Sequence, residues 1–289
     1  VHSFEELKFQ SALALQCHIN EYVYNQSRDE KKVLGALEGL VKQALENNKK
    51  PSAQIILCLA SYKSLNDYEW SNLLKATNET KDVFIRQIEE PRQETNLRKK
   101  IPLLKNITDK ISTKVRGQYE VNPYPRWVNL KLRLKSASIS QITSEIRLNI
   151  FDNSIKYVES PEILVAGCGT GQHSIGTATR FSGSKVLAVD LSLSSLAYAK
   201  RKTEELNVQN IDYMQADILD LRKLDRQFDI VESAGVIHHM DNPLIAWGIL
   251  KDCLKSGGLM KIALYSELAR KHIVEMRKEI NRAGLGSND

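Results

Sequence analysis

The apolar residues of this sequence change their spacing near residue 160, and that change constrains the fold more than any other feature. Before it, apolar residues recur with a helical period almost throughout, as in 31–47, where they fall along one face of a helix. After it, short continuous apolar runs alternate with amphipathic segments. Strands that alternate with helices form βαβ units around a parallel sheet. The sequence therefore predicts an all-helical N-terminal region followed by an α/β domain with a doubly wound, mainly parallel sheet.

The α/β part consists of predicted strands and helices in alternation. The predicted strands are the apolar runs 163–166, 185–189, 211–214, 228–232 and 259–264. The predicted helices are 171–181, 194–206, 243–254 and 267–283, preceded by one more at about 139–158. Right-handed crossovers bring the C-terminal ends of the strands to one side of the sheet, where α/β proteins bind ligands.

The segment 122–127 (NPYPRW) interrupts the helical pattern. Its two prolines force an extended or turn conformation, because each fixes its own φ and restricts the residue before it. We expect a helical N-terminal region at 1–120, a linker that contains this motif at 121–137, and the α/β domain at 138–289.

The composition argues against several classes of protein. No apolar run reaches the roughly 18 residues of a membrane span, and the first ten residues do not resemble a signal peptide. The four cysteines are scattered without a C-x-x-C pair, so neither a metal site nor a disulfide framework is indicated. We therefore expect reduced thiols and a cytoplasmic location. The net charge of +6 is spread over short clusters, which are typical of solvated helix faces.

A glycine-rich loop, 167–171 (GCGTG), lies between the first predicted strand and its helix. Glycines there allow positive φ and let a ligand approach the backbone. Asp190 ends the second strand, close to the spacing of about 20 residues at which a carboxylate meets ribose hydroxyls. A dinucleotide fingerprint would need glycine or alanine where the chain has Gln172, and no P-loop Lys-Ser/Thr pair follows. The loop need not hold a pyrophosphate, and a nicotinamide-dependent oxidoreductase is disfavoured.

These motifs occur in an order that resembles a known family. They are ILVAGCGTG at 163–171, VLAVD at 186–190, QAD at 215–217, GVIHHMDNP at 235–243 and KSGG at 255–258. Over roughly residues 138–283 they resemble the class I S-adenosylmethionine-dependent methyltransferases. The resemblance implies a Rossmann-like sheet and S-adenosylmethionine as the cofactor. QYEVNPYPRWV at 118–128, together with GCGTGQHSI, more narrowly resembles bacterial methyltransferases that carry tetratricopeptide repeats upstream.

The resemblance also implies which residues bind the cofactor. The three loop glycines would line its methionine and ribose parts, Asp190 would accept hydrogen bonds from the ribose hydroxyls, and Asp217 would lie beside the adenine. Residues 233–238 would border the sulfonium. For both aspartates the alternative is a helix N-cap. The full expected set is Gly167, Cys168, Gly169, Gly171, Asp190, Leu191, Ala216, Asp217, Ile218 and Ser233.

Val165 departs from the family pattern, which places Asp or Glu two residues before the first glycine of the loop. In the family, this carboxylate helps to organise the methionine end of the cofactor. The departure leaves a second hypothesis open, in which the methyltransferase domain is degenerate and the chain is a non-catalytic helical interaction protein.

Methyl transfer from a sulfonium is an in-line displacement, so the protein mainly aligns the reactants, which alone is worth about 7–11 kcal/mol. A base is needed only where the acceptor must lose a proton. His238 and His239 are the candidates, because histidine titrates near neutrality; the alternative is that they only hold their loop. Residues 233–236 lack the N/D-P-P-Y/F motif of enzymes that methylate the amino groups of bases.

The leading hypothesis is therefore an S-adenosylmethionine-dependent methyltransferase that acts on a small-molecule or protein acceptor, with nucleic acid disfavoured. We expect the N-terminal helices to bind a protein partner or to cover the substrate. Class I methyltransferases close their sheet with two further strands, and Asp289 lies only one helix beyond the fifth predicted strand. We therefore expect a fragment whose sheet lacks the last strands, with an unpaired edge that favours association.

Overall fold

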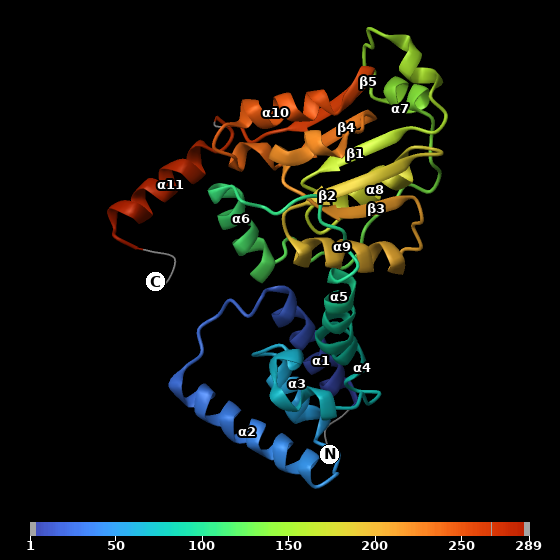
Figure 1. The fold of residues 1–289 in the computed structure, drawn as a ribbon. Helices are drawn as coiled ribbons and strands as arrows, with labels where there is room; N and C mark the ends of the chain where they lie inside the picture. Colours follow the sequence, from blue (N-terminus) through green and yellow to red (C-terminus); the bar gives the residue numbers. More distant parts are fainter. Residues whose placement is uncertain (1–3, 267, 286–289) are drawn as a thin grey trace. The chain divides into compact units, whose positions relative to one another are not determined.

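The computed structural model describes residues 4–266 and 268–285, and it contains two compact units, 1–99 and 100–289 (Figure 1). The division falls earlier in the chain than the boundary expected after residue 120. It assigns the NPYPRW segment and the helix before it to the same unit as the α/β domain. Each unit is described by itself below.

Helices are the regular secondary structure of the first unit's described residues, joined by turns and loops, which confirms the helical N-terminal region. Its longest helix begins at a capping box that links Ser27 and Glu30, since each side chain accepts a hydrogen bond from the other residue's backbone N–H. Inside the unit, the buried amide of Gln87 donates to the carbonyl of Ala60 and accepts from the N–H of Leu65. The elements are α1 (Phe4–Ile19), α2 (Arg28–Glu46), α3 (Ala53–Ala60), η1 (Leu65–Asp67), η2 (Glu69–Leu73), α4 (Lys81–Phe84), η3 (Ile85–Glu89) and α5 (Glu90–Arg98).

The second unit is built on a five-stranded parallel sheet in the order β3-β2-β1-β4-β5 (Figure 1). Every predicted strand is present, and the Rossmann-like, doubly wound fold is confirmed. The order reverses direction at β1, so the ends of β1 and β4 form a crevice of the kind in which such sheets bind ligands. The strands are β1 (Glu162–Ala166), β2 (Lys185–Asp190), β3 (Ile211–Gln215), β4 (Phe228–Ala234) and β5 (Leu254–Ala263).

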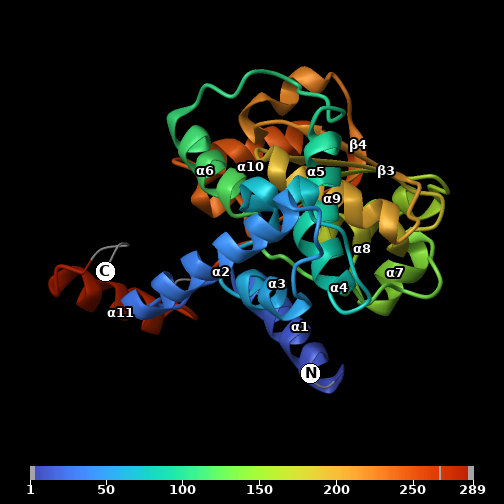
Figure 2. The same cartoon turned by 90° about the horizontal axis from the view of Figure 1, so that it is seen from below.

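Alternate residues of the strands point to opposite faces of the sheet, and both faces are covered. On one face, Leu164 and Val231 pack in a core with α10 (Pro243–Asp252) and η5 (Ile218–Leu224). The other face is covered by α8 (Gln172–Arg180) and α9 (Leu193–Glu205) (Figure 1, Figure 2).

The NPYPRW segment lies against the glycine loop and α9. The hydroxyl of Thr170 donates to the carbonyl of Pro125, and the indole N–H of Trp127 donates back to the Thr170 carbonyl. Tyr198 of α9 donates its hydroxyl to the carbonyl of Trp127. These bonds attach the expected linker to the part of the sheet that carries the ligand loop. The helix that precedes it is α6 (Lys110–Val121).

The helix expected at 139–158 is interrupted, which corrects the sequence-based prediction. The segment forms α7 (Ile139–Glu145) and a separate 3₁₀ turn, η4 (Asn153–Tyr157). Arg147 has a left-handed φ of 52°, a conformation that ends a helix, and Asp152 caps the turn by accepting from the N–H of Ser154. The sequence-based prediction extended one helix across this break, because the spacing of apolar residues does not reveal the left-handed backbone at Arg147.

The last described helix is α11 (Lys271–Arg282), and it lies within the predicted 267–283, of which residue 267 is outside the described residues. In the part of the chain that the structure describes, no helix has both the length and the apolar character needed to cross a membrane.

Candidate functional site

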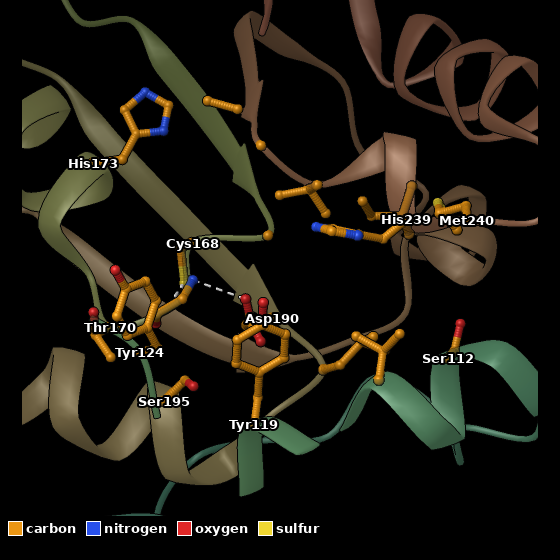
Figure 3. A pocket seen from close by; sticks show the side chains of 18 of the residues that line it. Ser112, Tyr119, Tyr124, Cys168, Thr170, His173, Asp190, Ser195, His239 and Met240 are labelled. Carbon is orange, nitrogen blue, oxygen red and sulfur yellow. Dashed lines mark hydrogen bonds between the residues drawn. The ribbon is translucent and has the colours of Figure 1, made fainter. Parts of the chain in front are cut away.

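A cavity of about 380 Å³ lies in the second unit, where the C-terminal ends of β1, β2 and β4 meet α6 (Figure 3). Its volume is in the range of small-molecule sites. The wall combines the glycine loop, the ends of the strands and one face of α6. The residues that line it are Ile111, Ser112, Val115, Tyr119, Tyr124, Pro125, Gly167, Cys168, Gly169, Thr170, Gln172, His173, Asp190, Leu191, Ser195, Ala216, Asp217, Ile218, Ala234, Gly235, Val236, His239, Met240 and Tyr265.

The glycines of the loop are required by the backbone and by close packing. Gly167 and Gly171 have φ values of 74° and 87°, which side-chain-bearing residues rarely adopt. A Cβ at Gly167 would lie 2.3 Å from a methyl of Val236, and one at Gly171 would lie 2.6 Å from the Cβ of Ala199. Gly171 is also the N-cap residue of α8 and does not line the cavity.

Asp190 joins the end of β2 to the glycine loop. One carboxylate oxygen accepts from the backbone N–H of Gly169 at 2.8 Å, and the other accepts from the N–H of Ser192 at 3.0 Å. Burial raises the pKa of Asp190, although these backbone hydrogen bonds oppose the shift. The N-cap of α9 is Ser192, whose hydroxyl accepts from the N–H of Ser195, so Asp190 is not the cap.

Asp217 does act as an N-cap, because its carboxylate accepts from the N–H of Leu219 in the first turn of η5. It also lines the cavity, so the capping and ligand-binding interpretations are compatible. Among the other expected cofactor-binding residues, Leu191, Ala216 and Ile218 line the same cavity. Ser233 does not; its hydroxyl is buried and has no hydrogen-bond partner in the described part of the protein.

Several lining residues were not expected from the sequence, above all Tyr119 of α6 and Tyr124 of the NPYPRW segment. Both line the cavity: Tyr119 lies beside Asp190, and Tyr124 lies beside Cys168 and Thr170 of the glycine loop (Figure 3). The next residue after Tyr119, Glu120, holds α6 against α9, because its carboxylate accepts from the N–H groups of Leu193 and Ser194 at 2.7 and 3.0 Å. The sequence signal that could have identified these tyrosines was the resemblance of 118–128 to one group of methyltransferases.

Ser195 was also missed, and it is the clearest polar group without a partner at the site. Its hydroxyl is buried, lines the cavity, and has no hydrogen-bond partner among the described residues (Figure 3). A buried hydroxyl is normally paired, so a bound ligand would supply what this one lacks.

The two histidines after β4 take different positions. His239 lines the cavity, whereas the ring of His238 does not and packs 4.2 Å from His239 and 4.0 Å from Tyr265. The guanidinium of Arg270 lies 3.9 Å from the centre of the Tyr265 ring. Burial lowers the pKa of both histidines, and the positive charge of Arg270 lowers it further, so both rings are neutral at pH 7.

Comparison with known proteins gives a match to the α/β part of the chain. Residues 163–258 match the family model of the methyltransferase domain. An uncharacterized protein of Synechococcus sp. is 32% identical over 121 residues, which are 42% of this chain and 29% of that protein. A ubiquinone biosynthesis O-methyltransferase of Acinetobacter baumannii is 31% identical over 117 residues, which are 39% of this chain and 47% of that protein. The chain thus spans less than half the length of these relatives.

Among solved structures, the chain is similar to magnesium protoporphyrin IX methyltransferase from Synechocystis PCC 6803 with bound S-adenosylmethionine. The two share 20% sequence identity with a TM-score of 0.37, and the match covers 52% of this chain and 75% of that one.

The family match begins at β1 and includes the glycine loop, Asp190, Asp217 and the segment with both histidines. The parallel sheet around it has the order and crossovers expected of the class I fold. Residues 163–258 therefore match a methyltransferase domain, on a sheet with the strand order of the class I fold, and S-adenosylmethionine is the cofactor that this match implies.

Proposed function

We propose that this chain transfers a methyl group from S-adenosylmethionine to a small-molecule or protein acceptor bound at the cavity. The observation that carries the proposal is the Asp190 carboxylate, which is fixed to Gly169 at the wall of a cavity of suitable volume. A carboxylate held in this way is already oriented to accept from a pair of ribose hydroxyls.

The remaining lining residues fit an adenosine group. The carboxylate of Asp217 can accept from the adenine amino group, and the apolar side chain of Ile218 gives the ring a surface to pack on. The unpaired hydroxyl of Ser195, which lines the same cavity, can bond to the ligand. Glycine at 167 and 169 lets the ligand lie against the backbone.

The cofactor supplies an activated methyl group, so the protein's main task is to orient the acceptor and to exclude water. Met240, Val236 and Tyr265 give the His239 end of the cavity an apolar wall. We propose that His239 accepts the acceptor's proton where one must be lost, because its ring faces the cavity and is neutral at pH 7. His238 then supports that ring by packing. The name of the Acinetobacter relative supports an oxygen acceptor, which needs such a base.

The N-terminal helices remain the proposed site for a protein partner. Their relation to tetratricopeptide repeats and the cytoplasmic location of the chain stay predictions.

The proposed function is tested by calorimetric titration with S-adenosylhomocysteine, with NADH as the control ligand. We expect saturable micromolar-range binding of S-adenosylhomocysteine alone, and its loss in Asp190→Ala. Folded protein that binds neither ligand would instead support the non-catalytic interaction protein.

A further inference from the structure

Three side chains form a row across the sheet beside the glycine loop. Strand pairing places Val165 of β1 beside Glu232 of β4, and Glu232 beside Lys261 of β5. Paired residues of parallel strands point to the same face of the sheet, here the face that α8 covers. Glu232 therefore brings a carboxylate next to the position, Val165, at which the chain has no acid.

The Glu232 side chain is only 3% exposed, and hydrogen-bond donors and cations surround it. One oxygen accepts from the hydroxyl of Thr177 and lies 3.0 Å from Nε2 of His173. The other lies 3.7 Å from the guanidinium of Arg180 and 3.9 Å from Nζ of Lys261. Burial alone would raise the pKa of Glu232, but the hydrogen bond and charge of His173, with Thr177, lower it to about 2. Glu232 is thus a carboxylate at neutral pH.

His173 connects this buried carboxylate to the cavity. It lies in the first turn of α8 and is one of the residues that line the cavity. Its Nε2 faces Glu232 and also lies 3.3 Å from Nζ of Lys261. The shorter contact, to the Glu232 carboxylate, favours the tautomer with the proton on Nε2, which then donates to Glu232. In that tautomer the Lys261 ammonium is a neighbouring cation and not a hydrogen-bond partner of this nitrogen. Nδ1 of His173 has no hydrogen-bond partner in the ranges 4–266 and 268–285, so it is the nitrogen that a ligand can reach.

His173 lies at a different end of the cavity from the groups proposed to hold the adenosine. Figure 3 shows His173 on one side of the loop that carries Cys168, and Asp190 and Ser195 on the other side. With the adenosine at Asp190, the part of the cofactor that extends toward His173 is its amino-acid end. That end carries two charges, which need partners when they leave water.

We propose that Glu232 and His173 form the subsite for the charged amino-acid end of S-adenosylmethionine, with His173 as the contacting residue. This inference rests on the proposed function. Glu232 is a positioning residue, because it acts through the His173 ring and does not itself line the cavity. β4 thereby supplies the acid that β1 lacks at Val165.

The test compares two ligands that differ only at this end. S-adenosylhomocysteine has the amino-acid group, whereas 5′-methylthioadenosine keeps the adenosine and the sulfur without it. We expect Glu232→Gln and His173→Phe in the whole chain to weaken S-adenosylhomocysteine binding at least about tenfold, as is usual for a lost charged hydrogen bond. Binding of 5′-methylthioadenosine should change by less than about twofold.

Matched controls are Glu162→Gln, at the opposite end of β1, and His272→Phe, exposed on α11. Each control variant should bind S-adenosylhomocysteine and 5′-methylthioadenosine as the unaltered chain does. Thermal unfolding checks that every variant is folded. An equal loss for the two ligands, or no loss in either variant, would overturn the subsite. Failure of the unaltered chain to bind either ligand would instead refute the proposed function.

Discussion

The carboxylate of Asp190 accepts a 2.8 Å hydrogen bond from the backbone N–H of Gly169, and this contact fixes the glycine loop to the neighbouring strand. Its other oxygen is held by the N–H of Ser192, at the start of α9. One side chain therefore sets the relative positions of the loop, the end of β2 and the helix after it. The site is ordered by the chain itself, so a ligand need not spend binding energy on ordering it.

Asp190→Ala should weaken S-adenosylhomocysteine binding by roughly ten- to hundredfold, because it removes both the ribose acceptor and the support of the loop. Calorimetric titration measures the loss. Asp212→Ala, an exposed carboxylate on β3, is the control and should bind as the unaltered chain does. Equal affinities for the two variants would contradict the role of Asp190.

Gly167→Ala should lower the free energy of unfolding by on the order of 3 kcal/mol, because its φ of 74° is strained for alanine and the new Cβ meets Val236 at 2.3 Å. Denaturant unfolding gives the value. Gly117→Ala is the matched change: it lies in α6 with nothing within 4 Å of an added Cβ, and should be neutral or slightly stabilising. The prediction fails if the two variants are equally stable.

Glu232 should make the stability of the protein sensitive to acid. Its pKa falls from an ordinary 4.5 to about 2 on folding, so its contribution is present above pH 4.5 and is lost as the pH falls toward 2. That contribution is on the order of 3 kcal/mol. The free energy of unfolding, measured from pH 7 to pH 2, should therefore differ between the protein and Glu232→Gln at neutral pH and converge in acid. A difference that is independent of pH would argue against an ionised Glu232 in the folded protein.

The pKa of His239 should lie below 6.5, because burial and the charge of Arg270 both disfavour its protonated form. NMR titration of the imidazole resonances measures it directly. Arg270→Gln should raise the pKa of His239 and of His238, whereas Arg277→Gln on the exposed part of α11 should leave both unchanged. An unshifted His239 would weaken its assignment as the base.

The parts of the fold that depend on local pattern could be predicted from the sequence. Apolar runs that end in glycine or aspartate mark β1 and β2, and the structure brings Gly169 and Asp190 together as the loop-and-acid pattern implies. The same pattern did not reveal the break at Arg147, because a positive φ in a non-glycine residue leaves no mark on hydrophobic spacing.

The far wall of the site depends on contacts between residues distant in sequence, which a pattern does not encode. Tyr119 faces the cavity because Glu120 binds the start of α9, more than seventy residues later. Likewise, in the sequence alone Glu232 is a single polar residue in a buried strand. Its position beside Val165 follows only from the pairing of β1 with β4. Ser233 was expected beside the cofactor, but it is not among the residues that line the cavity.

The two hydrogen bonds between Thr170 and the NPYPRW segment show that the site extends upstream of the matched family domain. The family match starts at residue 163, yet Pro125, Trp127 and the whole of α6 lie upstream of it. A polypeptide trimmed to the match would lack the lining residues that lie between 111 and 125. The carbonyl of Thr170 would also lose the hydrogen bond that it accepts from the indole N–H of Trp127. The shortest segment that would keep the complete cavity therefore begins before α6, at about residue 100, where the second compact unit starts.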